Sequence, residues 1–250
     1  MTSKNGSNGA IGTPVKREYL DVVVTDVNPA TGAFSYQVVG DSIKQLERLM
    51  AEIQTAYASN ASGAPAVKVG DLVAAKFSED DTWYRARVKR VDRTAGKAEV
   101  QYIDYGNAEL IALTRLRTLD AKFTSLPPQA KEAKLSFVQF PTSEEYLADA
   151  VYAFQNLVAD RQLVASIDRR EGGGLSLSLY DPVTTEADPN ESVNAVLVSA
   201  GAVTVLPAKQ ATWEASLYAT TLASLRARQA DAQKRRLGMF EFGDSTGYDE

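Results

Sequence analysis

Between residues 19 and 39 apolar and polar positions alternate, which is the period of a half-buried β-strand. Residues 19–27 are rich in β-branched side chains, and residues 33–39 resume the pattern after a turn at 28–32 that contains Pro and Gly. Two such runs joined by turn-forming residues predict a β-hairpin.

The spacing then changes to that of a helix. Apolar residues recur every three or four positions from Ile43 to Tyr57, which predicts a helix with one buried face. Ser42 and Gln45 match a capping box that would begin this helix. The small and polar residues 58–66, which include Gly and Pro, predict a linker.

Short alternating runs return between residues 67 and 113. Ala95 and Gly96 form a predicted hairpin tip in this region. Short strands joined by tight turns over about 50 residues are typical of a small barrel. The predicted strands are residues 68–77, 83–91, 97–103 and 108–113.

The last half of the chain mixes both periods. Thr142 and Glu145 match a second capping box, and Gly201 is placed to end a helix in the left-handed conformation. The predicted elements are a strand at 130–139, a helix from 142 onward, a hairpin at 163–180, a polar loop at 181–191, a helix at 192–200, a strand at 202–206 and a long helix at 213–236.

Together these elements predict a mainly β fold of the α+β class, in which one barrel interrupts another domain. A hairpin and one helix cannot enclose a core, so residues 15–60 are expected to pack with residues 120–243. The small barrel, residues 66–119, would be inserted between these two halves. Residues 1–14 are expected to be a disordered linker or tag, and residues 244–250 a tail.

The amino-acid composition limits the kinds of functional site that the chain can contain. The 250 residues contain no Cys and no His, which excludes disulfides, thiolate–zinc sites and His-based catalysis in this chain. The formal net charge of −5 argues against binding of nucleic acid through overall charge. No apolar run approaches the roughly 18 residues of a membrane span, and the polar N-terminal residues do not resemble a signal peptide.

Aromatic residues make up 8% of the chain, and five of them lie in the predicted small barrel. Phe77, Tyr84, Tyr102 and Tyr105 would line one pocket if their strands pair. Electron-rich ring faces favour a weakly hydrated cation. Small barrels also bury aromatic residues, so core packing is the alternative for all four, and Trp83 is expected to be core or rim.

The barrel carries an ordered set of motifs. They are Ala75-Lys76-Phe77, Trp83-Tyr84-Arg85-Ala86-Arg87-Val88 and Tyr102-Ile103-Asp104-Tyr105-Gly106-Asn107. In this order they resemble the extended Tudor module at the C-terminus of Tudor-SN (Tudor staphylococcal nuclease) proteins. The opening strands and the segments 46–50, 114–119 and 237–244 extend the resemblance to roughly residues 17–244.

The resemblance implies a Tudor SH3-like barrel inserted into a staphylococcal-nuclease-like domain of the oligonucleotide-binding (OB) type. It implies that Phe77, Tyr84, Tyr102 and Tyr105, with Asn107 as polar partner, bind symmetrically dimethylated arginine. The partners would be Arg-Gly-rich proteins, for example Sm-type or PIWI-type tails. The whole protein would regulate RNA, in connection with the RNA-induced silencing complex (RISC), in the cytoplasm and also in the nucleus.

Physical chemistry agrees with these roles. Methylarginine is planar, cationic and poorly hydrated, so it is expected to stack between parallel rings. The expected affinity is micromolar or weaker. Asp104 would either add negative charge beside the rings or fix the local turn.

A second function class is the binding of single-stranded RNA by the OB barrel. Arg85, Arg87, Lys89 and Arg90 form a basic strand that is either a solvated face or a strip that tracks phosphates. A third class is a purely architectural domain, without a ligand.

A nuclease is the fourth alternative. Catalysis in the staphylococcal nuclease fold needs carboxylates that hold Ca²⁺ and two arginines that face phosphate. Asp21, Asp26 and Asp41 form no such constellation and are expected to be surface residues and a cap. Asp181, Asp188 and Glu191 lack the spacing of a metal loop. A catalytically silent scaffold is therefore predicted, with no catalytic residue, metal or cofactor.

Overall fold

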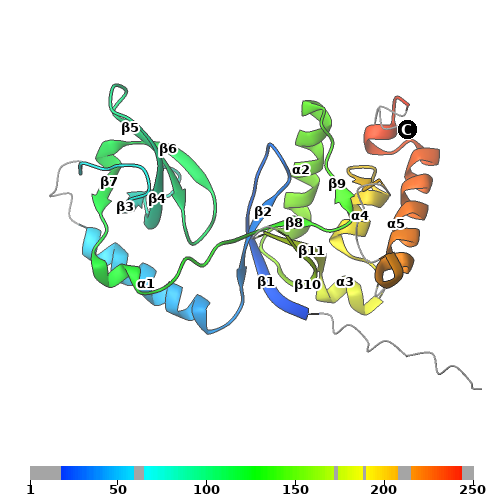
Figure 1. Ribbon diagram of the computed structural model, residues 1–250, viewed down its shortest axis with the longest axis horizontal. Coiled ribbons are helices and arrows are strands. Elements are labelled where there is room, and N and C mark those ends of the chain that lie inside the picture. Colours follow the sequence, from blue (N-terminus) through cyan, green and yellow to red (C-terminus); the bar gives the residue numbers. More distant parts are fainter. Residues whose placement is uncertain (1–17, 59–64, 172–173, 188–189, 208–214, 244–250) are drawn as a thin grey trace, which may run out of the picture.

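The computed structural model describes residues 18–58, 65–171, 174–187, 190–207 and 215–243. Figure 1 shows two lobes side by side, which we call the inserted lobe (residues 65–119) and the outer lobe (residues 18–38 and 130–243). The expected linker at 1–14 and the tail at 244–250 lie outside the described residues. None of the described helices combines the length and the apolar character that a membrane crossing needs.

The inserted lobe is a five-stranded antiparallel sheet with the order β6-β5-β4-β3-β7. Its apolar side chains, among them Val73, Val88 and Val100, share one core. The four predicted strands are confirmed, and Leu116–Thr118 adds a fifth where the sequence pattern indicates only an exit from the module. The strands are β3 (Leu72–Lys76), β4 (Trp83–Asp92), β5 (Lys97–Tyr102), β6 (Ala108–Ala112) and β7 (Leu116–Thr118).

The outer lobe contains a closed barrel with the order β1-β10-β11-β8-β2. Strands β1 and β2 precede the inserted lobe in the sequence, and they pair with β10 and β8, which follow it. The predicted fold class, a small β module inserted into a second barrel domain, is confirmed. The strands are β1 (Glu18–Val27), β2 (Phe34–Val38), β8 (Lys131–Leu135), β10 (Gln162–Glu171) and β11 (Gly174–Tyr180).

Helices cover the barrel of the outer lobe on the side away from the inserted lobe (Figure 1). Their buried faces contribute Phe154, Leu197 and Leu225 to one core with the barrel strands. The elements are β9 (Val138–Gln139), α2 (Glu144–Val158), α3 (Pro182–Ala187), α4 (Val193–Ser199), β12 (Thr204–Val205), α5 (Ala215–Arg235) and η3 (Gly238–Phe240).

Two predictions for this region are wrong in detail. The strand expected at 130–139 is divided into β8 and β9, because Phe137 has a positive φ of 66° that interrupts an extended chain. The loop expected at 181–191 contains the short helix α3.

The helix starts differ from the predicted capping boxes. One N-cap residue is Gly40, which has no side chain for capping, and the other is Ser143, whose side chain makes no capping hydrogen bond. The capping boxes predicted from Ser42 and Thr142 are therefore wrong. The helix end predicted at Gly201 is confirmed, since this residue follows α4 with a φ of 67°.

Helix α1 (Asp41–Tyr57) corrects the predicted packing. Its buried face lies against the inserted lobe and against Phe123, so of residues 15–60 only the hairpin joins the barrel of the outer lobe. The Gln54 side chain fixes this contact by donating to the Trp83 carbonyl at 2.7 Å and accepting the Trp83 N–H at 2.9 Å. The cluster includes Leu46, Leu49, Ile53, Ala74, Trp83 and Phe123. Trp83 is thus a core residue, as predicted.

Candidate functional site

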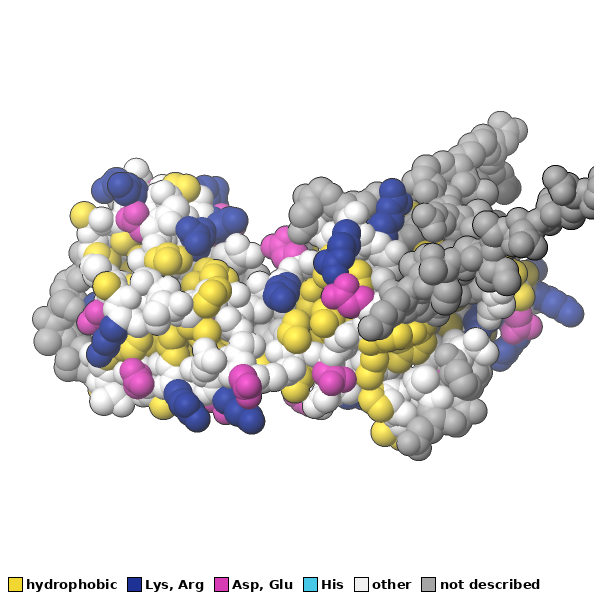
Figure 2. Space-filling view, turned by 60° about the horizontal axis from the view of Figure 1, so that its bottom comes forward, with side chains coloured by type: hydrophobic (Ala, Val, Ile, Leu, Met, Phe, Trp, Pro, Cys, Tyr) yellow, Lys and Arg dark blue, Asp and Glu magenta, His cyan; other side chains and the backbone are white. Residues whose placement is uncertain are grey.

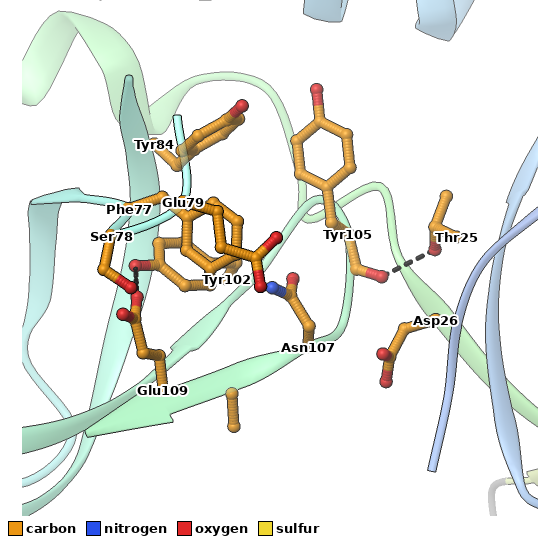
Figure 3. A pocket seen from close by; sticks show the side chains of 11 residues that line it. Thr25, Asp26, Phe77, Ser78, Glu79, Tyr84, Tyr102, Tyr105, Asn107 and Glu109 are labelled. Atoms are coloured by element: carbon orange, nitrogen blue, oxygen red, sulfur yellow. Dashed lines mark hydrogen bonds between the residues drawn. The ribbon is translucent and has the colours of Figure 1, made fainter. Parts of the chain in front are cut away.

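The four ring residues singled out in the sequence converge on one pocket of about 520 Å³ (Figure 3). Phe77 follows β3, Tyr84 lies on β4, Tyr102 ends β5, and Tyr105 lies in the turn before β6. The ring centroids are 5.2 Å apart for Phe77 and Tyr102, 5.7 Å for Tyr84 and Tyr102, and 5.3 Å for Tyr84 and Tyr105. Asn107 also lines the pocket.

The rings form walls rather than a stack. The planes of Tyr84 and Tyr105 meet at 85°, and those of Phe77 and Tyr84 at 86°. The expectation of parallel rings is wrong for the ring pairs in contact, because neighbouring rings prefer the edge-to-face arrangement. Tyr102 is 1% exposed and forms the base, whereas Phe77, Tyr84 and Tyr105 are half-buried and keep part of their surface open.

Carboxylates hold two of the ring hydroxyls. The Tyr84 hydroxyl donates to Asp80 Oδ2 at 2.6 Å, and the Tyr102 hydroxyl donates to Glu109 Oε2 at 2.7 Å. Burial raises the pKa of both tyrosines, and these hydrogen bonds to carboxylates raise it further. The pKa of Tyr105 is raised as well, mainly by burial. All three rings therefore stay neutral at physiological pH.

The turn between β3 and β4 is fixed by an arginine that the sequence reasoning did not select. Arg115 Nη2 donates to the Phe77 carbonyl at 2.6 Å and to Asp81 Oδ1 at 2.6 Å, and its Nε donates to the Lys76 carbonyl at 2.8 Å. Asp80 Oδ1 accepts the Thr82 N–H at 2.8 Å. These contacts hold the backbone on which the Phe77 ring stands.

A buried ion pair holds the turn that carries Tyr105. Arg85 and Asp104 are each 1% exposed, and the guanidinium makes two hydrogen bonds to the carboxylate, at 2.9 Å and 2.6 Å. Arg85 also donates to the carbonyls of Phe123 and Leu126 in the connector, at 2.9 Å and 2.6 Å. Of the two roles open for Asp104 in the sequence, the structure supports the fixing of the turn.

The outer lobe contributes part of the pocket wall. Thr25 and Asp26, on β1, face the rings across the pocket (Figure 3). Asp26 is half-buried, and burial raises the pKa of its carboxyl. Sequence reasoning placed Asp26 among surface residues and missed this position, because β1 lies about 80 residues from Tyr105 and no local pattern links the two.

The pocket is acidic. Its lining residues include the carboxylates of Asp26, Glu79 and Glu109 and no Lys or Arg. Within the described residues, no Lys or Arg forms an ion pair with any of these three carboxylates. The field in the pocket therefore attracts cations and opposes anions.

The side chains of the basic strand, Arg85, Arg87, Lys89 and Arg90, make contacts within the protein. The prediction that Arg85 contacts nucleic acid is wrong, because this side chain is buried and paired. Arg87 donates to the Gly70 carbonyl at 3.1 Å, Lys89 donates to Gln101 at 3.4 Å, and Arg90 pairs with Glu99 at 3.3 Å. On the face shown in Figure 2, described Lys and Arg side chains are interspersed with Asp and Glu over both lobes.

The acidic residues weighed for nuclease chemistry are dispersed. Asp21 and Asp41 are exposed, on β1 and at the start of α1, and Asp181 pairs with Arg161 at 2.7 Å. Asp188 lies outside the described residues. Across the described ranges, no three carboxylates gather closely enough to hold a metal ion.

Comparisons with known proteins match this architecture. A Tudor domain family model matches residues 14–136. The solved extended Tudor domain of Drosophila melanogaster Tudor-SN (p100) is 31% identical, with a TM-score of 0.78, and the match covers 90% of this chain and 100% of that one. The chain belongs to the extended Tudor domains of the Tudor-SN family.

Two further relatives are similar to this extended Tudor domain. It is 34% identical over 250 residues to Staphylococcal nuclease domain-containing protein 1 of Schizosaccharomyces pombe, and it spans 28% of that protein's length. Extended Tudor domain TD3 of mouse TDRD1, solved with a MILI peptide containing dimethylarginine, is 25% identical, with a TM-score of 0.66, over 76% of this chain and 94% of that one. The inserted lobe corresponds to the Tudor barrel, and the outer lobe to the staphylococcal-nuclease-like part.

Proposed function

We propose that this extended Tudor domain binds symmetrically dimethylated arginine in Arg-Gly-rich partner proteins, such as Sm-type or PIWI-type tails. The observation that carries the proposal is the convergence of four aromatic rings and Asn107 on one open, acidic pocket. The complex of the mouse TDRD1 domain with a dimethylarginine peptide supports the same use of the fold.

The pocket chemistry suits a methylated guanidinium. Methylation removes N–H donors and keeps the positive charge, so the ligand gains apolar contact with the rings while the carboxylates of the pocket still attract its charge. Each cation–π contact contributes about 0.5–2 kcal/mol. After the ordering of the peptide is subtracted, the expected affinity is micromolar or weaker.

The nuclease-like lobe acts in this proposal as a scaffold rather than as a catalyst. The dispersed carboxylates and the acidic pocket support this role. Incubation of the domain with single-stranded RNA and Ca²⁺ should leave the RNA intact. Cleavage that is abolished by a carboxylate substitution in the domain would contradict the scaffold role.

Calorimetric titration with three forms of one Arg-Gly peptide tests the function. The symmetrically dimethylated peptide should bind at least several-fold more tightly than the unmodified one, since only the former fills the ring-lined pocket without excess N–H donors. The asymmetrically dimethylated peptide should be intermediate. Equal affinity for all three forms would refute the proposal.

A matched pair of tyrosine substitutions separates the pocket from the rest of the surface. Tyr105→Ala removes one pocket wall and should abolish the preference for methylation. Tyr152→Ala removes a ring that is 66% exposed on α2, outside the pocket. It should leave the affinity unchanged. Thermal unfolding of both variants should show that each remains folded.

A further inference from the structure

Three successive residues of the Tudor barrel, Asp104 to Gly106, are held by the outer lobe. Gln37 Nε2, on β2, donates to the Asp104 carbonyl at 2.6 Å, and Thr25 Oγ1, on β1, donates to the Tyr105 carbonyl at 2.6 Å. A Cβ added at Gly106 would collide with the Ser35 side chain, so the two backbones lie in close contact here.

The same turn is held from the barrel side. Asp104 binds Arg85 through both carboxylate oxygens, and its Oδ1 also accepts the Gln129 N–H at 3.2 Å. Gln129 lies in the connector that leads into β8 of the outer lobe. The backbone that carries the Tyr105 ring is therefore fixed by hydrogen bonds from both the outer lobe and the barrel.

Of these residues, Gln37 is the one best suited to test the contact between the lobes. It is 8% exposed, makes a single described side-chain hydrogen bond, and does not line the pocket. Thr25, by contrast, lines the pocket itself and could touch a ligand. The hydrogen bond to the Asp104 carbonyl is therefore the described side-chain contact through which Gln37 can act on the pocket.

We infer that Gln37, on the nuclease-like lobe, is a positioning residue for ligand binding, which sets the Tyr105 wall of the pocket through the Asp104 carbonyl. The inference rests on the proposed function for its binding consequence. The contact between the two lobes thus influences the affinity of the pocket. When the hydrogen bond from Gln37 is lost, the Tyr105 ring moves, although every side chain that lines the pocket is still present.

The test compares Gln37→Met with Gln229→Met. Both changes remove one amide that bonds a backbone group, since Gln229 Oε1 accepts the Val205 N–H at 2.6 Å within the outer lobe. Gln229 has no contact with the turn. Two quantities are measured: the affinity for the symmetrically dimethylated peptide, and the ¹⁹F NMR signal of Tyr105 in protein labelled with 3-fluorotyrosine, assigned through Tyr105→Phe.

Gln37→Met should shift or broaden the Tyr105 signal of the free protein and weaken peptide binding about three- to tenfold, the effect expected of one hydrogen bond. Gln229→Met should change neither. In a Tyr105→Leu background, Gln37→Met should cost less than about twofold, because coupled residues are not additive.

Each other outcome decides against the inference. An unchanged Tyr105 signal would show that Gln37 does not set this wall, and a changed signal with unchanged affinity would show that the wall's position does not matter. An equal loss of affinity in the Tyr105→Leu background would show a route other than Tyr105. Absence of any methylation preference in the wild-type domain would instead refute the proposed function, and the Tyr105 signal alone would then still report on the positioning.

Discussion

Each lobe contains a group of aromatic rings with nearly the same geometry, and only one group forms a pocket. Phe34 and Phe154 in the outer lobe meet edge-to-face at 5.4 Å and 76°, and Phe77 and Tyr102 in the Tudor barrel meet at 5.2 Å and 76°. The two groups differ in how much of the ring surface is exposed to solvent. Phe34 and Phe154 are 2% and 0% exposed in the core of the outer lobe, whereas Phe77, Tyr84 and Tyr105 of the Tudor ring group are only half-buried.

Contacts between aromatic rings therefore do not by themselves mark a binding site. The outer-lobe rings satisfy one another and the helices α2, α4 and α5 complete their packing. In the Tudor barrel the rings are braced by Asp80 and Glu109 instead, which hold the hydroxyls and leave ring faces open. A site of this kind is a cluster of aromatic rings that is partly open to solvent. Substitutions of these rings should affect binding more than stability.

The largest expected effect is on the buried ion pair between Arg85 and Asp104, which both lie in the inserted lobe. Asp104→Ala leaves the Arg85 charge buried without its partner, which should lower the free energy of unfolding by about 3–5 kcal/mol. Chemical denaturation measures this change. A loss below about 1 kcal/mol would show that Arg85 finds sufficient compensation in the connector carbonyls.

Truncation should mainly lower the stability in one ring group and mainly lower the peptide affinity in the other. Phe154→Ala should lower the free energy of unfolding by about 3–5 kcal/mol through a cavity in the core and leave peptide affinity of the folded protein unchanged. Phe77→Ala should cost about tenfold or more in affinity, equal to about 1.4 kcal/mol, with a smaller loss of stability. Chemical denaturation and peptide titration of both variants measure the two losses, and a reversal of the two would show that the Tudor rings serve the core and not the pocket.

Asp26→Asn should raise stability at neutral pH and weaken binding. Burial raises the carboxyl pKa in the folded protein, so the folded state holds a proton at a higher pH than the unfolded state. The free energy of unfolding therefore falls as pH rises from about 4, the unfolded value, through the folded pKa. The Asn variant lacks this fall.

The effect of Asp26 on peptide binding has the opposite sign. The charged carboxylate attracts the cationic peptide, so affinity should decrease as pH falls through the raised pKa, and Asp26→Asn should be weaker at pH 7 by about two- to fivefold, the size of a partly exposed ion pair. Titration over this pH range checks the prediction. A variant with unchanged affinity and the wild-type pH dependence would remove Asp26 from the site.

The smallest expected effect is that of Tyr84→Phe. The ring remains, and only the hydrogen bond to Asp80 is lost, so affinity should fall by no more than about threefold. Tyr84→Leu is the comparison variant, because it removes the ring and should cost more. Similar losses for the two would show that the hydroxyl, rather than the ring face, determines binding.

Local patterns in the sequence predicted much of the fold. Alternation predicted the hairpin and the strands of the Tudor barrel, and the helical period predicted α1, because each element buries one face and its period follows from backbone geometry. The capping boxes failed, since one N-cap residue is a glycine and the serine at the other makes no capping bond. The packing partner of α1 was also missed, because an apolar stripe does not specify which surface covers it.

The order of the sequence motifs was enough to predict that four rings belong together, those of Phe77, Tyr84, Tyr102 and Tyr105. The residues that face these rings and support them became visible in the folded chain alone. Asp26 and Gln37 reach the pocket and its supporting turn from strands far away in the chain, and Arg85 is buried rather than exposed. These contacts join segments that are far apart in the sequence, and no local period encodes a contact between distant segments.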